Sequence, residues 1–147
     1  MEMVTRNAER KWNTQLVYDI GKRRSELCKA KDFHAAWFRH WCDQLNETPN
    51  FHRKQWEFVY VMQALWERGC IAPGKRGLVF AVGTEPLPAM FASFGCSIVA
   101  TDIFPDKGVE MGWDNANQLC FGLESLNKRR LCEEADFAKL VNYRPVD

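Results

Sequence analysis

The chain has 147 residues, a length that allows one ordinary domain. Hydrophobic residues make up 46% of it and charged residues 27%, a balance typical of a globular protein rather than of a disordered one. The formal net charge is only +1, which argues against general binding to a polyanion such as nucleic acid.

The cysteines and the lack of long apolar runs indicate the compartment. The six cysteines are scattered without a CxxC pair, so their spacing fits neither a zinc site nor a disulfide scaffold. No stretch approaches the roughly 18 consecutive apolar residues of a membrane span, and the first residues lack the apolar core of an export signal. We therefore expect a cytoplasmic protein with reduced thiols and no membrane contact.

Residues 1–70 are expected to form an N-terminal helical segment. Apolar residues recur at helical spacing in three stretches, which are residues 6–28, 31–45 and 51–69. Asp32 is a possible N-cap of the second helix, whose apolar face is expected to contain Phe33, Trp37 and Trp41. Asn50 is a possible N-cap of the third helix, which is apolar nearly all round and is therefore expected to be buried.

Residues 71–147 have a different character. The apolar runs at residues 77–82 and 96–103 are typical of buried strands, and a further strand is expected to begin at Val141. Helical patterns are expected at residues 85–95, 116–132 and 133–141, with a loop at 104–115. This alternation predicts an α/β fold, a Rossmann-like parallel sheet of which the chain supplies the first three strands.

A candidate ligand site lies where these strands end, because ligands of open parallel sheets bind at the carboxyl ends of the strands. The ends are residues 81–85, residues 102–104 and Asp147. Gly83 has no Cβ, so it would let the backbone turn tightly and let a ligand approach the main chain. Asp102 follows 19 positions later (102 − 83), where an acid can accept hydrogen bonds from both hydroxyls of a ribose.

Glu85 favours one class of cofactor over another. A GxGxxG frame laid over Ala81, Gly83 and Pro86 keeps only one glycine. A pyrophosphate would sit at the start of the following helix, where the carboxylate of Glu85 would repel it and no basic residue of the turn compensates. S-adenosylmethionine, which has a ribose, a positive end and no phosphate, fits better than a nicotinamide dinucleotide.

The stretch "LVFAVGTEPLPAMFASFGCSIVATD", residues 78–102, resembles the first motif of class I S-adenosylmethionine-dependent methyltransferases. In this register Gly83 takes the central glycine and Asp102 the ribose-binding acid, while Ala92 and Gly95 take the small residues at the end of the helix. The resemblance covers roughly residues 50–147. It implies S-adenosylmethionine as the cofactor and a cofactor-binding site that consists of Ala81, Gly83, Thr84, Glu85, Asp102, Ile103 and Asp147.

Three positions depart from the family pattern. Val79 stands where most members have an acid, and Ala81 and Glu85 replace the outer glycines. Glu85 either pairs with the ammonium group of the methionine moiety or favours the helix N-terminus through the dipole, and the sequence leaves both open. The three strands are the first half of such a domain, so the regions that usually contact adenine and the methyl acceptor lie outside them. The sequence therefore names no catalytic residue.

Two classes of function follow. The first is a methyltransferase or its truncated cofactor-binding half, and the second is a non-catalytic remnant that acts as a binding or oligomerisation module. A nicotinamide-dependent Rossmann protein is a third hypothesis, which Glu85 disfavours. The strand that begins at Gly77 would be an open apolar edge. We therefore expect a homo-oligomer, or a second chain that completes the sheet.

Other conspicuous residues have plainer interpretations. His34 and His40 are six positions apart and point to different helix faces, so no metal site is expected. Cys96 is expected to be structural. Trp113 and Asp114 either lie near the adenine or pack within a loop. The tryptophans at helical spacing are expected to be core residues, namely Trp37, Trp41, Trp56 and Trp66.

Overall fold

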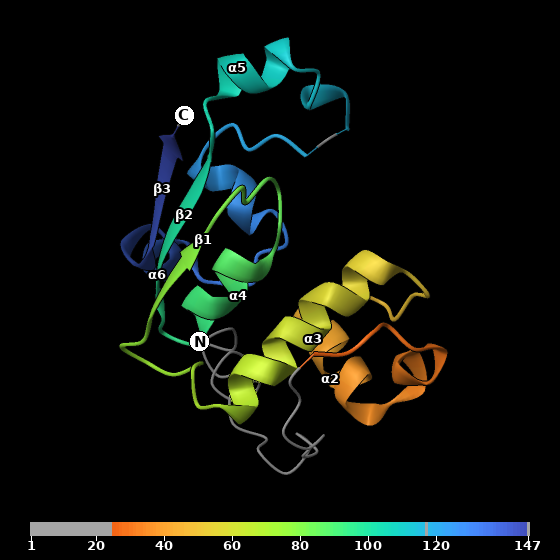
Figure 1. Cartoon of the computed structure of the whole chain (residues 1–147). Coiled ribbons are helices and arrows are strands. Elements are labelled where there is room, and N and C mark those ends of the chain that lie inside the picture. Colours follow the sequence, from red (N-terminus) through yellow and green to blue (C-terminus); the bar gives the residue numbers. More distant parts are fainter. Residues whose placement is uncertain (1–24, 117, 147) are drawn as a thin grey trace. The chain divides into compact units, whose positions relative to one another are not determined.

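The computed structural model describes residues 25–116 and 118–146 and divides into two compact units between Cys70 and Ile71 (Figure 1). The first unit is helical, and the second is built on a parallel sheet. Most of the helix expected at residues 6–28 lies outside the described residues, and residues 25–28 are not helical. Within the described ranges, no helix is both long and apolar enough to cross a membrane.

The first unit contains the 3₁₀ helix η2 (Ala30–His34) and the α-helices α2 (Ala36–Gln44) and α3 (Arg53–Glu67). The expectation of a single helix over residues 31–45 is wrong. The backbone is extended at Ala35, and this residue separates η2 from α2. Asp32 lies inside η2 and does not cap α2. Its Oδ2 instead accepts a hydrogen bond from the indole N–H of Trp56 at 2.9 Å, so the carboxylate is drawn into the core.

Helix α3 also begins differently from the expectation. Its N-cap is His52, whose Nδ1 accepts from the backbone N–H of Lys54 at 3.2 Å. The N–H of Asn50 donates to the side chain of Gln55 at 2.7 Å, so Asn50 is tied to the first turn without capping it. The expected burial holds for only part of the helix, because Trp56, Val59 and Met62 are buried whereas Val61 is exposed.

Aromatic side chains form the core of the first unit. Trp41 is fully buried, and its indole N–H donates to Oε1 of the equally buried Gln63 at 2.6 Å. The ring of Trp66 meets that of Trp41 edge-on, with 6.0 Å between the centroids. Trp37 and Trp56 are also buried, so Trp37, Trp41 and Trp56 are core residues as expected, whereas Trp66 is only half-buried.

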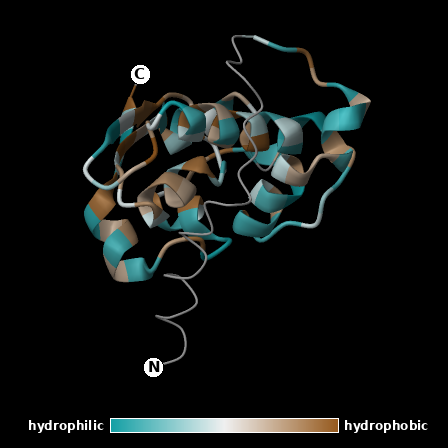
Figure 2. Cartoon of the chain, turned by 90° about the horizontal axis from the view of Figure 1, so that it is seen from below, coloured by the Kyte–Doolittle hydropathy of each residue, from teal (hydrophilic) through white to brown (hydrophobic). Residues whose placement is uncertain are grey.

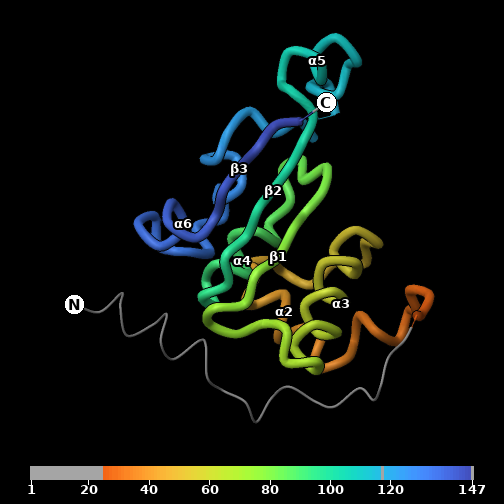
Figure 3. The backbone as a smooth tube through the Cα atoms, turned by 60° about the vertical axis from the view of Figure 1, so that its left-hand side comes forward, coloured from red at the N-terminus to blue at the C-terminus, as the bar shows by residue number. Residues whose placement is uncertain are grey.

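The second unit contains the α/β fold that the sequence predicts. Its strands are β1 (Arg76–Val79), β2 (Ser97–Ile103) and β3 (Val141–Val146), which pair in parallel in the order β1-β2-β3. Helix α4 (Leu87–Ser93) connects β1 to β2, and α6 (Glu134–Leu140) leads directly into β3. Figure 3 shows the three strands side by side, with β2 in the middle.

Between β2 and β3 the structure corrects two expectations. The loop expected at 104–115 contains the helix α5 (Pro105–Glu110), which begins on a proline, a residue well suited to the first turn of a helix. The 3₁₀ helix η3 (Asp114–Ala116) closes this stretch, and in place of the helix expected at 116–132 the described residues form the short 3₁₀ helix η4 (Leu123–Asn127). The side chain of Asn127 ends η4, because its amide group hydrogen-bonds the backbone of Leu131 and Cys132.

Both helices that connect the strands cover the same face of the sheet. Crossovers between parallel strands are right-handed, and successive crossovers in one direction therefore fall on one side. Burial agrees with this rule. Ile98 and Ala100 of β2 and Val141 of β3 are buried beneath the helices, whereas Ser97 and Asn142, on the other face, are exposed.

Candidate functional site

The turn after β1 contains two residues in the left-handed region, Ala81 with φ 47° and Gly83 with φ 53°. Glycine adopts this conformation at no steric cost, whereas a residue with a Cβ is strained there by about 1–2 kcal/mol. Between them, the N–H of Val82 donates to the carbonyl oxygen of Thr101 at 2.9 Å and fixes the turn to β2. The first frame position therefore has a glycine-like backbone although the residue is alanine.

Asp102 is buried near the end of β2 and binds the turn directly. Its Oδ2 accepts a hydrogen bond from the N–H of Gly83 at 2.9 Å, and its Oδ1 accepts from the N–H of Ile103 at 2.9 Å. The structure thus brings together Gly83 and Asp102 at the carboxyl ends of β1 and β2. A carboxylate can accept about four hydrogen bonds, so about two acceptor positions of Asp102 remain for a ligand.

The segment formed by residues 118–122 lies against this turn. A Cβ added at Gly83 would lie 2.5 Å from the carbonyl oxygen of Gln118, too close for any side chain. The missing Cβ of Gly83 therefore makes room for the chain itself. The phenol of Tyr143 donates to the carbonyl oxygen of Cys120 at 3.1 Å and holds the segment to β3. The sequence gives no signal for Gln118, because only the fold brings it to Gly83.

Two side chains of this region, the thiol of Cys120 and the phenol of Tyr143, carry protons that can be exchanged. Cys120 is buried, and burial raises the pKa of its thiol above the ordinary value. Burial likewise raises the pKa of Tyr143. Both groups therefore stay protonated near neutral pH, so neither provides a ready thiolate nucleophile or phenolate base.

The remaining residues of the expected site surround the turn less closely. Thr84 and Glu85 are half-buried, and the N–H of Glu85 donates to the carbonyl oxygen of Val82 at 3.1 Å. The helix expected at residues 85–95 begins only at Leu87, so Glu85 precedes it. Ala81 is exposed, Ile103 is half-buried at the end of β2, and Asp147 lies outside the described residues.

Other residues noted in the sequence take no part in the hydrogen bonds described above between the turn and Asp102. Trp113 is exposed just after α5, and Asp114 begins η3. Cys96 is buried and donates to the carbonyl oxygen of Ala72 at 3.4 Å, and burial raises its pKa. Within residues 25–116 and 118–146, no three His, Cys, Asp or Glu side chains gather in a way that could hold a metal ion.

The site therefore consists of a carboxylate and a tight glycine turn at the ends of two parallel strands, an arrangement that can accept hydroxyl groups. In comparisons with known proteins, no family model, no curated protein and no solved structure matches this chain.

Proposed function

We propose that the second unit is the S-adenosylmethionine-binding half of a class I methyltransferase domain. The observation that carries the proposal is the hydrogen bond from the N–H of Gly83 to Asp102 at the carboxyl ends of β1 and β2. It places the expected ribose-binding acid beside the expected glycine turn. The fold supports the proposal only in general terms, because many functions share a parallel α/β sheet.

In this proposal Asp102 accepts hydrogen bonds from the two ribose hydroxyls through its remaining acceptor positions. The backbone N–H of Gly83 donates a hydrogen bond to this carboxylate and fixes its position. Glu85 faces the positive methionine end of the cofactor or stabilises the start of α4. Thr84, Ile103 and Ala81 complete the surroundings of the cofactor.

The cofactor supplies the reactive methyl group when it is bound. Methyl transfer is an in-line displacement, so the main contributions of this chain are to hold the ribose and to orient the sulfonium end. Cys120 and Tyr143 stay protonated and are not the bases for an acceptor.

The residues fit the cofactor only if the segment 118–122 can move. The carbonyl oxygen of Gln118 covers the turn at Gly83, and Asp102 is buried. This covering also favours the second hypothesis, a non-catalytic binding module in which Asp102 is a purely structural acid. A nicotinamide-dependent protein is the least favoured of the three hypotheses, because the carboxylate of Glu85 next to the turn would repel the phosphates of the dinucleotide.

Calorimetry of the purified chain with S-adenosylmethionine and S-adenosylhomocysteine tests the proposal. We expect binding of both, and we expect Asp102→Ala to weaken it by about 10-fold or more, because hydrogen bonds to a charged group are lost. Asp136→Ala, which removes an exposed acid of α6, is the matched control and should bind as the native chain does. No binding by a folded native chain would leave the non-catalytic module, and tight NADH binding would indicate the nicotinamide hypothesis.

A further inference from the structure

Among the described residues of the second unit, no helix covers one face of the sheet. Helices α4 and α6 lie on the other side of the sheet. The strand register identifies the side chains that point away from these helices, and we call this set the open face. Its members in the strands are Arg76, Leu78, Ser97, Val99, Thr101, Ile103, Asn142, Arg144 and Val146, of which only Thr101 is buried, and the exposed Phe80, which directly follows β1, is counted with them. Leu78 is 54% exposed, and Phe80, at the end of β1, is 73% exposed.

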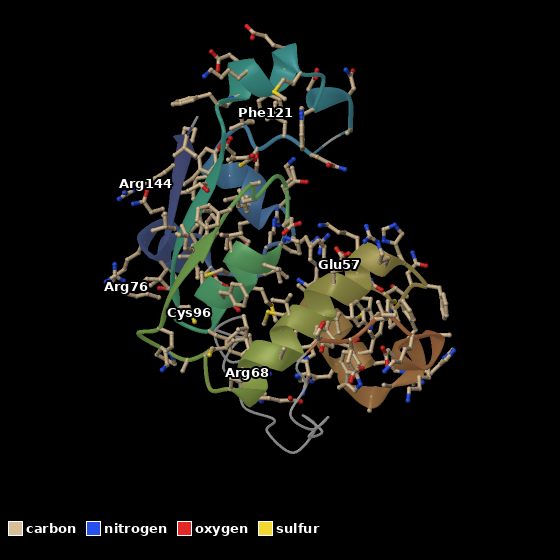
Figure 4. All side chains as sticks on the ribbon, viewed as in Figure 1. Glu57, Arg68, Arg76, Cys96, Phe121 and Arg144 are labelled. Carbon is tan, nitrogen blue, oxygen red and sulfur yellow. The ribbon has the colours of Figure 1, made fainter. Side chains whose placement is uncertain are left out.

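The open face is apolar at its centre and basic at its border. Figure 2 shows hydrophobic colouring on the strands near the C-terminal end of the chain. Arg76 and Arg144 project from the sheet, labelled on the same side in Figure 4, and no carboxylate belongs to the set. Parallel sheets are normally covered on both faces, so a surface of this kind is suited to an apolar partner that carries acidic groups.

The same unit carries a surface of the opposite kind. Helix α5 and the residues around it, 104–113, project beyond the carboxyl end of the sheet in Figures 1 and 3, and we call them the α5 knob. Exposed apolar side chains cover the knob, and they are Phe104, Val109, Met111 and Trp113. The knob also exposes Asp106 and Glu110, with Lys107 as its single base, which gives a net charge of −1 (1 − 2).

We propose that the open face and the α5 knob are the two halves of one interface, and that a second copy of this chain supplies the knob. Apolar side chains of the knob cover Leu78 and Phe80, while Asp106 and Glu110 approach Arg76 and Arg144. In a two-fold dimer each copy gives one knob and receives another, so both open faces are covered.

Charge complementarity favours a second copy of this chain, rather than a different protein, as the partner that covers the open face. Both members of the interface are present on the chain, and each exposes apolar residues bordered by charges of one predominant sign. Complementary potentials of this kind orient partners and suppress wrong pairings. The inference stands on the sheet and α5 alone and is independent of cofactor binding.

Sedimentation velocity of the full chain over about 1–100 μM tests the proposal, a range that covers micromolar affinities. We expect a monomer–dimer equilibrium. The face variant Arg76→Glu/Arg144→Glu should weaken dimerisation at least about tenfold, and so should the knob variant Asp106→Lys/Glu110→Lys. Because the charges are then exchanged, the variant that combines all four substitutions should regain most of the affinity.

Two controls separate lost charge pairing from lost folding. Lys139→Glu reverses an exposed charge on α6 and should leave the dimer unchanged. Circular dichroism and the urea unfolding midpoint should be equal for native and variant chains. Phe80→Ser, which removes the exposed ring without changing charge, should also weaken the dimer.

Three results would overturn the proposal. A native monomer at every concentration would show that a second copy does not cover the open face. A dimer insensitive to the face and knob variants would lie elsewhere on the chain. Loss of the dimer in both charge variants without recovery in the combination would show that the knob does not dock on the open face.

Discussion

Gly83 combines a left-handed backbone with a neighbour too close for a side chain. Replacement by alanine would strain φ and push the new methyl group against the carbonyl oxygen of Gln118. We expect Gly83→Ala to lower the free energy of unfolding by about 2–5 kcal/mol, the sum of backbone strain and overpacking. Denaturation by urea, followed by circular dichroism, measures this.

Gly74→Ala is the matched control for that variant, because Gly74 has φ 80° and nothing within 4 Å of an added Cβ. It should show the backbone strain alone, about 1–2 kcal/mol. Equal losses in the two variants would mean that Gln118 does not press on Gly83 in solution.

Cys42 links the stability of the first unit to alkaline pH. It is fully buried, and burial raises the pKa of its thiol from 9.0 to about 12. Above pH 9 the unfolded chain loses this proton while the folded chain keeps it, so the native state binds more protons and stability falls as pH rises.

We therefore expect the free energy of unfolding to fall between pH 9 and 12, by at most about 1.4 kcal/mol for each pH unit from this group. Cys42→Ala should be less stable at pH 7 but should have a shallower pH dependence. Cys70→Ala, which replaces an exposed thiol, should keep the native slope. Guanidinium unfolding at several pH values measures the slopes, and identical slopes in native and Cys42→Ala chains would contradict the account.

At the scale of elements, periodicity predicts the strands and the order of the second unit well. The run at 96–103 contains β2, and β3 begins at Val141 as expected, but the run at 77–82 overlaps β1 only at residues 77–79, because the strand begins at Arg76 and the chain turns at Ala81. These short apolar runs next to glycine indicate strands from local sequence alone, but β1 is not the buried strand that its run predicts, because none of its residues is buried and Leu78 is exposed. The carboxyl-end rule then joins Gly83 to Asp102 without any knowledge of side-chain positions.

Features that depend on contacts between residues far apart in the sequence cannot be predicted from local patterns. Asp32 has the residue type of an N-cap, yet the indole of Trp56, 24 positions away, binds its carboxylate. Asn127 sits in a helical pattern but closes a turn with Leu131 and Cys132. The cover over Gly83 comes from Gln118, which no local pattern indicates.

The contact between α2 and α3 rests partly on one buried hydrogen bond. The indole N–H of Trp41 donates to Oε1 of Gln63 at 2.6 Å, and both side chains are fully buried. Trp41→Phe removes this donor and some apolar volume, so we expect a loss of about 2–4 kcal/mol in the free energy of unfolding.

A double-mutant cycle with Gln63→Leu isolates the hydrogen bond from the volume change. The combined variant should be more stable than the sum of the two single losses predicts, because neither partner then leaves a buried polar group behind. Strict additivity of the two losses, measured by thermal and urea unfolding, would show that the two helices do not depend on this bond.

At the scale of the whole molecule, we propose that the turn at Gly83 and the carboxylate of Asp102 form a ribose site. Nuclear magnetic resonance tests it most directly, because the N–H groups of Gly83 and Ile103 both donate to Asp102 and should report any new partner of that carboxylate. Addition of S-adenosylmethionine should shift both amide resonances together and saturably, and neither should move in Asp102→Asn. Resonances that stay in place, or that shift equally in the variant, would contradict the account.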